Sequence, residues 1–200
     1  VMATRHGADF WAQQMKIDPE AARHKSYELY WIWNEKAAWM RAAADLNPFG
    51  TRRFLWTDTG YLRHLKFNGQ QLVKRWPRDC GDGQVLFLNI ARFRPEDFTA
   101  GALIQTNRLS GNMWGGTREA LGAWHEAFYG AFDEFVRAGL FSGKDQYMMA
   151  TACARVPALC YLVEPLYAGR RLDRIERWFV LAFILHGDTP LFRYDLTTGP

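Results

Sequence analysis

The sequence has little cysteine and no long apolar run. Its three cysteines, Cys80, Cys153 and Cys160, form no Cys-x-x-Cys pair. This pattern indicates neither a zinc knuckle nor a secreted disulfide framework, and it slightly favours a reducing compartment such as the cytoplasm. The longest apolar run, residues 178–185, is too short to cross a bilayer, and no secretory signal opens the chain. Because the chain starts at Val1, an upstream segment with an anchor or a signal for a secretory lumen is also compatible with it.

The sequence also lacks a block of basic residues and the commonest nucleotide motifs. The net charge of +4 comes from Lys and Arg scattered along the chain, so no nucleic-acid partner is expected, only a mild attraction for anionic ligands. No GxxxxGK[ST] loop, GxSxG elbow or GxGxxG fingerprint is present. Their absence removes the commonest nucleotide-hydrolysing, serine-hydrolase and dinucleotide-binding interpretations.

The composition is that of a soluble globular domain with an excess of aromatic residues. Apolar residues make up 48% and charged residues 23% of the chain, and its length of 200 residues predicts one domain, residues 1–200. Aromatic residues make up 16%, including nine Trp, which is more than a core requires. Most of them are expected in the core, and the surplus is typical of sugar or base sites.

Hydrophobic periodicity predicts an α/β fold with a largely buried sheet. A helix over residues 27–46 ends where Pro48 and Gly50 stop it, and an apolar strand over residues 53–57 follows. The other elements expected are strands over residues 85–90, 102–106 and 159–163, helices over residues 117–138 and 142–155, and a long loop or hairpin over residues 60–83.

Asp58 is the clearest candidate for a functional residue. It closes the strand over residues 53–57 and is followed by Thr59 and Gly60. Ligands of open α/β sheets collect beyond the carboxyl ends of strands, so an acid at this place is well positioned to hold a metal ion or a polar substrate. The alternative is an Asx turn that caps the strand.

Two further polar clusters follow glycines or apolar runs. Asp145 and Gln146 come after Gly143, and His186 follows the last apolar run. A carboxylate and an imidazole from separate strand ends can bind Mn²⁺ or Mg²⁺ when a diphosphate supplies further ligands. The alternatives are a capping box from Ser142 to Asp145 and a solvated turn at His186.

The glycine-rich run Gly111–Gly116 allows a backbone to approach a ligand closely, and Trp114 within it can offer a ring face to a sugar. The alternative is a tight turn before the helix that starts near Thr117. Paired carboxylates that act as a glycosidase or another hydrolase also remain open.

Several motifs, in order along the chain, resemble the HtrL/YibB family. The motifs are SYELYWIWNEK over residues 26–36, LNPF over 46–49, FLWTDTG over 54–60 and GLFSGKDQY over 139–147. The family is similar to nucleotide-sugar glycosyltransferases of the GT-A fold, with a suggested link to cell-surface polysaccharide. The resemblance therefore implies a mixed sheet flanked by helices. GT-A domains usually open with a strand, whereas this chain opens with helix-like sequence, so the first strand is expected to be missing and the N-terminus truncated.

The resemblance also implies a set of site residues. Asp58 corresponds to the DxD motif and would bind the metal and the diphosphate, whereas Gly60 stands in place of its second acid. Asp145 is the expected general base of an inverting reaction. The other residues expected at the site are Asn34 and Lys36 near the diphosphate or donor sugar, Gly115 and Gly116 below the sugar, Gln146 at the sugar or acceptor, and His186 as a late metal ligand.

The leading hypothesis is a glycosyltransferase that uses a nucleotide-sugar donor and a glycan or other hydroxyl acceptor, with Mn²⁺ or Mg²⁺ or Lys36 stabilising the leaving group. The second is a non-catalytic carbohydrate-binding or interaction domain that keeps the fold and uses its aromatic residues as a sugar platform. The third is a carboxylate-based hydrolase.

Overall fold

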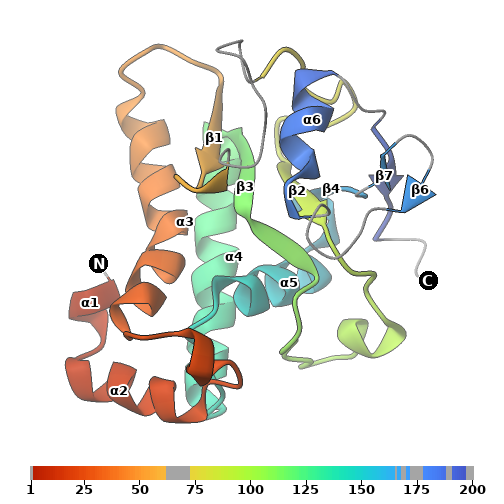
Figure 1. The fold of residues 1–200 in the computed structure, drawn as a ribbon. Helices are drawn as coiled ribbons and strands as arrows, with labels where there is room; N and C mark the ends of the chain where they lie inside the picture. Colours follow the sequence, from red (N-terminus) through yellow and green to blue (C-terminus); the bar gives the residue numbers. More distant parts are fainter. Residues whose placement is uncertain are drawn as a thin grey trace.

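The computed structural model describes residues 2–61, 73–164, 166–167, 170–171, 178–187 and 191–196. Helices come first along the chain, and strands and helices are then interleaved (Figure 1). Among the described residues no strand precedes β1. In chain order the elements are α1 (Met2–Arg5), α2 (Ala8–Ile17), the 3₁₀ helix η1 (Ala21–Arg23), α3 (Glu28–Leu46), β1 (Arg53–Thr57), β2 (Val85–Asn89), the 3₁₀ helix η3 (Pro95–Phe98), β3 (Leu109–Thr117), α4 (Arg118–Arg137), α5 (Asp145–Arg155), the 3₁₀ helix η4 (Pro157–Leu159), β4 (Cys160–Val163), β5 (Leu166–Tyr167), β6 (Arg170–Arg171), α6 (Val180–His186) and β7 (Arg193–Tyr194).

Five strands form a mixed sheet in the order β1-β3-β2-β4-β7. β3 is antiparallel to both of its neighbours, β1 and β2, whereas β2 and β4 are parallel and β7 is antiparallel to β4. Strands β1, β2 and β4 therefore run in one direction, and their carboxyl ends lie at the same edge of the sheet. The α/β class with a mixed sheet flanked by helices is confirmed.

Helices cover both faces of this sheet, as Figure 1 shows with α3 and α4 on one side and α6 on the other. Strand β2 shows the consequence for sequence, because all five of its residues are buried. Val85 and Phe87 belong to the core cluster that includes α3, α4 and α5, whereas Leu86 and Leu88 belong to the cluster that includes α6. A strand buried on both faces has no polar side, so residues 85–88 form a continuous apolar run.

The helices that carry the site begin and end for local reasons. α3 ends at Asn47, which adopts a left-handed conformation with φ 36°, and Gly50 follows with φ 62°. α4 begins after Thr117, whose side chain accepts a hydrogen bond from the backbone N–H of Ala120. Both ends agree with the sequence prediction. None of the described helices is both long and apolar enough to span a membrane.

The strand predicted over residues 102–106 and the alternative of a tight turn at Gly111–Gly116 are wrong, and part of the loop predicted over residues 60–83 lies outside the described residues. Residues 102–106 form no strand, because the backbone N–H of Ile104 donates to Thr151 Oγ1 of α5 at 2.9 Å instead of to a neighbouring strand. Gly111–Gly116 is not a tight turn but the centre of β3. There Gly115 lies so close to β1 that a Cβ would be 2.1 Å from the carbonyl oxygen of Phe54. The loop expected over residues 60–83 falls partly on residues 62–72, which lie outside the description.

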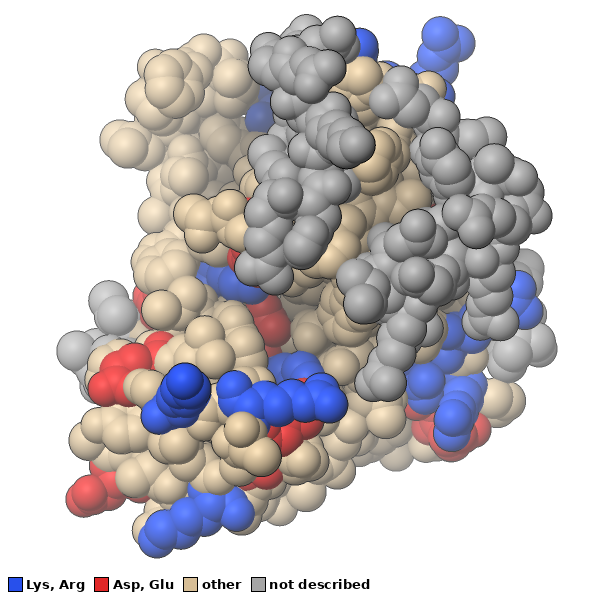
Figure 2. Space-filling view, viewed as in Figure 1, with Lys and Arg blue, Asp and Glu red and all other residues tan. Residues whose placement is uncertain are grey.

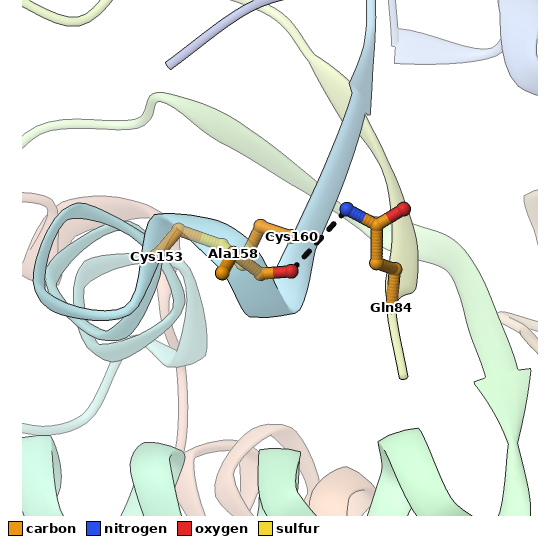
Figure 3. Close-up of a disulfide and its surroundings, with 4 residues drawn as sticks. All are labelled: Gln84, Cys153, Ala158 and Cys160. Carbon is orange, nitrogen blue, oxygen red and sulfur yellow. Dashed lines mark hydrogen bonds between the residues drawn. A yellow bond between two sulfur atoms is a disulfide. The ribbon is translucent and has the colours of Figure 1, made fainter. Parts of the chain in front are cut away.

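A disulfide joins the end of α5 to the start of β4, although the sequence indicated no disulfide framework. Cys153 and Cys160 are bonded with their Cα atoms 5.8 Å apart, whereas Cys80 is free and buried. In the turn between them, the carbonyl of Ala158 accepts a hydrogen bond from the side-chain amide of Gln84 at 3.2 Å (Figure 3). Disulfides persist in oxidising compartments, so this bond weighs against the reducing compartment that the cysteine pattern slightly favoured.

Candidate functional site

Lys36 lies at the centre of the candidate site. It comes from the middle of α3, and its Nζ lies 3.1 Å from Asp58 Oδ1 and 3.1 Å from Asp145 Oδ2. The same Nζ donates to the carbonyl oxygen of Gly111 at 3.1 Å. It also donates to Asp58 Oδ2 at 3.5 Å, whereas Asp145 Oδ2 lies at ion-pair distance from Nζ without a hydrogen bond. Lys36, Asp58 and Asp145 are called the Lys36 triad below.

Asp58 is held at the carboxyl end of β1 by its backbone and its side chain. Its N–H donates to the carbonyl of Asn112 at 2.8 Å, which extends the ladder one residue past β1, and its own carbonyl accepts from Tyr61 N. The side chain does not cap this turn, because Oδ1 accepts the indole N–H of Trp56 at 2.6 Å and contacts Lys36. Asp58 is therefore a member of the ion-pair cluster and not only a turn residue.

Asp145 is the first residue of α5, and its carboxylate faces β3. A Cβ on Gly111 would lie 2.9 Å from Asp145 Oδ2, so the absence of a side chain at Gly111 makes room for this carboxylate. The alternative of a capping box from Ser142 to Asp145 is wrong. Lys144 is the N-cap without a side-chain cap bond, and Ser142 Oγ has no hydrogen-bond partner among the described residues.

The members of the Lys36 triad differ in how far water reaches them. The side chain of Asp58 is 31% exposed, whereas those of Lys36 and Asp145 are 5% and 6% exposed. A substrate in solution can therefore touch Asp58 directly, whereas Lys36 and Asp145 are almost fully covered. Figure 2 shows basic and acidic side chains next to one another at the bottom of a hollow in this face of the molecule.

Burial and charge act in opposite directions on the pKa values of the triad. For Lys36, burial alone would lower the pKa, but the carboxylates of Asp145 and Asp58 outweigh it and the pKa is raised. For Asp145, burial raises the pKa of the carboxyl more than the Lys36 ammonium lowers it. The ammonium of Lys36 therefore stays charged, and the carboxyl of Asp145 binds a proton more readily than a free aspartate does.

Asn34 and Gln146 support the backbone around the triad. The Nδ2 of Asn34 donates to the carbonyls of Ser142 and Gly143, each at 3.1 Å, and so holds the loop that precedes Asp145. Gln146 Nε2 donates to the carbonyl of Leu109 at 2.6 Å and joins α5 to β3. These two residues lie beside the triad, as expected, and their contact with a donor sugar stays a prediction.

The glycines and the tryptophan of β3 lie inside the fold. Gly115 and Gly116 leave room for neighbouring backbone, because a Cβ would meet the carbonyl of Phe54 at Gly115 and that of Gln84 at Gly116. Trp114 is 2% exposed and packs against Phe87 and Trp124. Trp114 is therefore a core residue and not a sugar platform, and a sugar floor at the two glycines stays a prediction.

His186 does not follow a strand. It is the last residue of α6, where Gly187 adopts a left-handed conformation with φ 102°, and α6 packs on the face of the sheet opposite α3. Among the side chains that the structure describes, no group of three His, Cys, Asp or Glu could hold a metal ion. The ammonium of Lys36, in turn, lies between the two carboxylates that a cation would need. The described residues therefore do not fit a divalent ion at Asp58.

Sequence reasoning missed two residues of the site. Trp56 donates its indole N–H to Asp58, and Gly111 both accepts from Lys36 and makes room for Asp145. Trp56 could have been found, because residues two apart on a strand lie on the same face. Gly111 belongs to the glycine run that the sequence singles out, but its contact with Asp145 could not be predicted, since it depends on a helix that begins 34 residues later.

Comparisons of the chain with protein-family models, with curated proteins and with solved structures each gave no match. The resemblance to the HtrL/YibB family stays a prediction from the motifs.

Proposed function

We propose that the chain is a glycosyltransferase-like domain that transfers a sugar from a nucleotide-diphosphate donor to a hydroxyl acceptor. One observation carries the proposal: the Lys36 triad places an ammonium and a partly exposed carboxylate at the carboxyl edge of the sheet. Sugar transfer from a diphosphate needs positive charge near the departing diphosphate and a carboxylate near the attacking hydroxyl. The motifs that resemble the HtrL/YibB family, and the GT-A-like fold they imply, support the same reaction.

The geometry suggests a division of roles among the triad. Asp58, the exposed member, is positioned to take the proton of the acceptor hydroxyl. The oxygen of that hydroxyl forms a bond to the anomeric carbon of the donor sugar, while the bond from this carbon to the diphosphate breaks. Lys36 supplies the positive charge near the departing diphosphate. Asp145, which the motifs suggested as the base, is buried and acts by holding Lys36 in place.

Binding of the donor is the first test. Calorimetry with UDP- and GDP-sugars should give heat with the wild-type protein and a clearly weaker signal with Lys36→Met, which removes the positive charge that faces the diphosphate. The matched control is Arg41→Met, an exposed cation of α3 that pairs with Asp45 and not with the Lys36 triad. The control should bind as the wild type does. If the wild-type protein gives no heat with any of these donors, the proposal is wrong.

One observation favours a second candidate, a non-catalytic carbohydrate-binding domain. Trp39 is 43% exposed, and its ring stacks on that of Trp56 with centroids 5.9 Å apart and an interplanar angle of 20°. An exposed ring stacked on the tryptophan that donates to Asp58 is suited to a sugar, which offers C–H groups on its face and hydroxyls at its edge. In this case tryptophan fluorescence should respond to free glycans and not to nucleotides, and Trp39→Ala should remove the response.

A further inference from the structure

The ammonium of Lys36 is enclosed by oxygens from three separate elements of the fold. Asp58 follows β1, Gly111 is in β3 and Asp145 begins α5, and each places one oxygen 3.1 Å from Nζ. Two of these oxygens belong to carboxylates and the third to a backbone carbonyl. Oxygen ligands of these kinds are those that Ca²⁺, Mg²⁺ and Mn²⁺ use in proteins. The three oxygens are called the Lys36 cage below.

We propose that Lys36 is a built-in cation that occupies a latent divalent-cation site. Two consequences follow from this assignment. The donor should bind without added metal, a consequence that rests on the proposed function. Removal of the ammonium should turn the Lys36 cage into a site for a divalent ion, a consequence that does not depend on any substrate.

Charge and space explain why the ammonium and a metal ion exclude one another. Divalent ions bind oxygen at roughly 2.0–2.6 Å, so an ion that used the cage would lie almost where Nζ lies. The two positive groups would then be in contact, with no water between them to screen the repulsion. Lys36 would have to leave a position in which its side chain is only 5% exposed.

The same reasoning explains why the cage should accept an ion once it is empty. Without Lys36, Asp58 and Asp145 would face one another with no positive charge between them. A divalent ion offsets both carboxylates, and water that fills the space of the lost side chain can complete its coordination.

The test is a Mn²⁺ titration followed by electron paramagnetic resonance, with Lys36→Ala compared with the wild type. The variant should bind one Mn²⁺ about tenfold or more tightly than the wild type does, a change of the size seen when a group next to a metal is altered. Ca²⁺ should compete for the site, and the double variant Lys36→Ala/Asp58→Asn should lose it. Equal Mn²⁺ binding by Lys36→Ala and the wild type would overturn the proposal.

Two further measurements keep the test decisive. If Lys36→Ala unfolds when metal-free, its thermal transition should return on addition of Mn²⁺, and no return would count against the cage. In the wild-type protein, Mn²⁺ binding that Asp58→Asn abolishes would show that a metal displaces Lys36, and it would overturn the proposal without any Lys36 variant.

Calorimetry with UDP- and GDP-sugars in EDTA separates a failure of this proposal from a failure of the proposed glycosyltransferase function. Donor binding only in the presence of Mn²⁺ would contradict the proposal that Lys36 is a built-in cation. No donor binding with or without Mn²⁺ would contradict the glycosyltransferase function, and the Mn²⁺ titration of Lys36→Ala would then decide on the Lys36 cage alone.

Discussion

Helix α3 carries two clusters of three charged groups, and they differ mainly in burial. One is the Lys36 triad. In the other, Asp45 accepts from Arg41 at 2.7 Å and from Arg118 of α4 at 2.8 Å. The separations are as short as those in the triad, yet the side chains of Arg41, Asp45 and Arg118 are 41%, 38% and 68% exposed.

The comparison teaches that distance alone does not say what an ion pair contributes. Water already solvates the charges around Asp45, and it screens their attraction, so such pairs contribute little to stability. The charges of Lys36 and Asp145 have lost their water, and each depends on the other. The distance between Lys36 and Asp145 therefore matters both for stability and for the binding of a substrate beside Asp58.

The largest effect is expected from removal of the ammonium. Lys36→Met should reduce the free energy of unfolding by about 3–5 kcal/mol, because it leaves a buried carboxylate without its partner. Urea denaturation measures this. The double variant Lys36→Met/Asp145→Leu should recover part of the loss. A loss no larger than that of Arg41→Met would remove the distinction between the two clusters.

A smaller effect is expected from added volume at the triad. Gly111→Ala should lower the free energy of unfolding by roughly 1–3 kcal/mol, because its Cβ would lie 2.9 Å from a buried oxygen of Asp145. It should also weaken donor binding, since it displaces a carboxylate that holds Lys36. The matched control is Gly83→Ala, where a Cβ meets nothing within 4 Å. Equal thermal transitions for the two variants would contradict the packing described for Asp145.

The pH dependence of stability tests the burial of Asp145. Because its folded-state pKa is raised above 3.8, the contribution of its carboxyl is fully present below pH 3.8 and is lost as the pH rises through the folded value. Urea denaturation at pH values from below 3.8 upwards should therefore show that the free energy of unfolding of the wild type falls relative to that of Asp145→Asn as the pH rises. A difference that changes in favour of the wild type would mean that the carboxyl is held ionised.

The smallest effect is expected at the exposed cluster. Asp45→Asn should leave the thermal transition within experimental scatter, and added salt should reduce any remaining difference. Differential scanning calorimetry at low and high salt measures this. A large, salt-resistant loss would show that the Asp45 cluster behaves as a buried one does.

The sequence predicted the elements that local chemistry determines. The strand that ends at Asp58, the helix that Asn47 ends and the helix that Thr117 begins all follow from periodicity and end signals in the chain. Asp58 and Asp145 were predicted from their places at the end of a strand and the start of a helix, whereas Lys36, in the middle of α3, was predicted only from the motif that resembles the HtrL/YibB family. Their roles depend on packing, and here the predictions were incomplete.

Long-range contacts account for what the sequence did not show. The sequence predicts that Trp114 offers a ring face to a sugar, but β3 is a central strand and residues far along the chain bury this side chain. Ile104 has the side chain of a strand residue, yet a hydroxyl of α5 takes its N–H. Similarly, the position of the Lys36 ammonium between two carboxylates depends on three segments that meet only in the folded protein.

The indole N–H of Trp56 offers the most direct test, because it donates to Asp58 Oδ1 at 2.6 Å and so reports on the exposed carboxylate of the triad. Its NMR signal can be identified by its loss in Trp56→Phe. Addition of a UDP- or GDP-sugar in EDTA should shift this signal and leave that of the buried Trp124 unchanged. A Trp56 signal that no nucleotide-sugar moves, with or without Mn²⁺, would contradict a working site at the Lys36 triad.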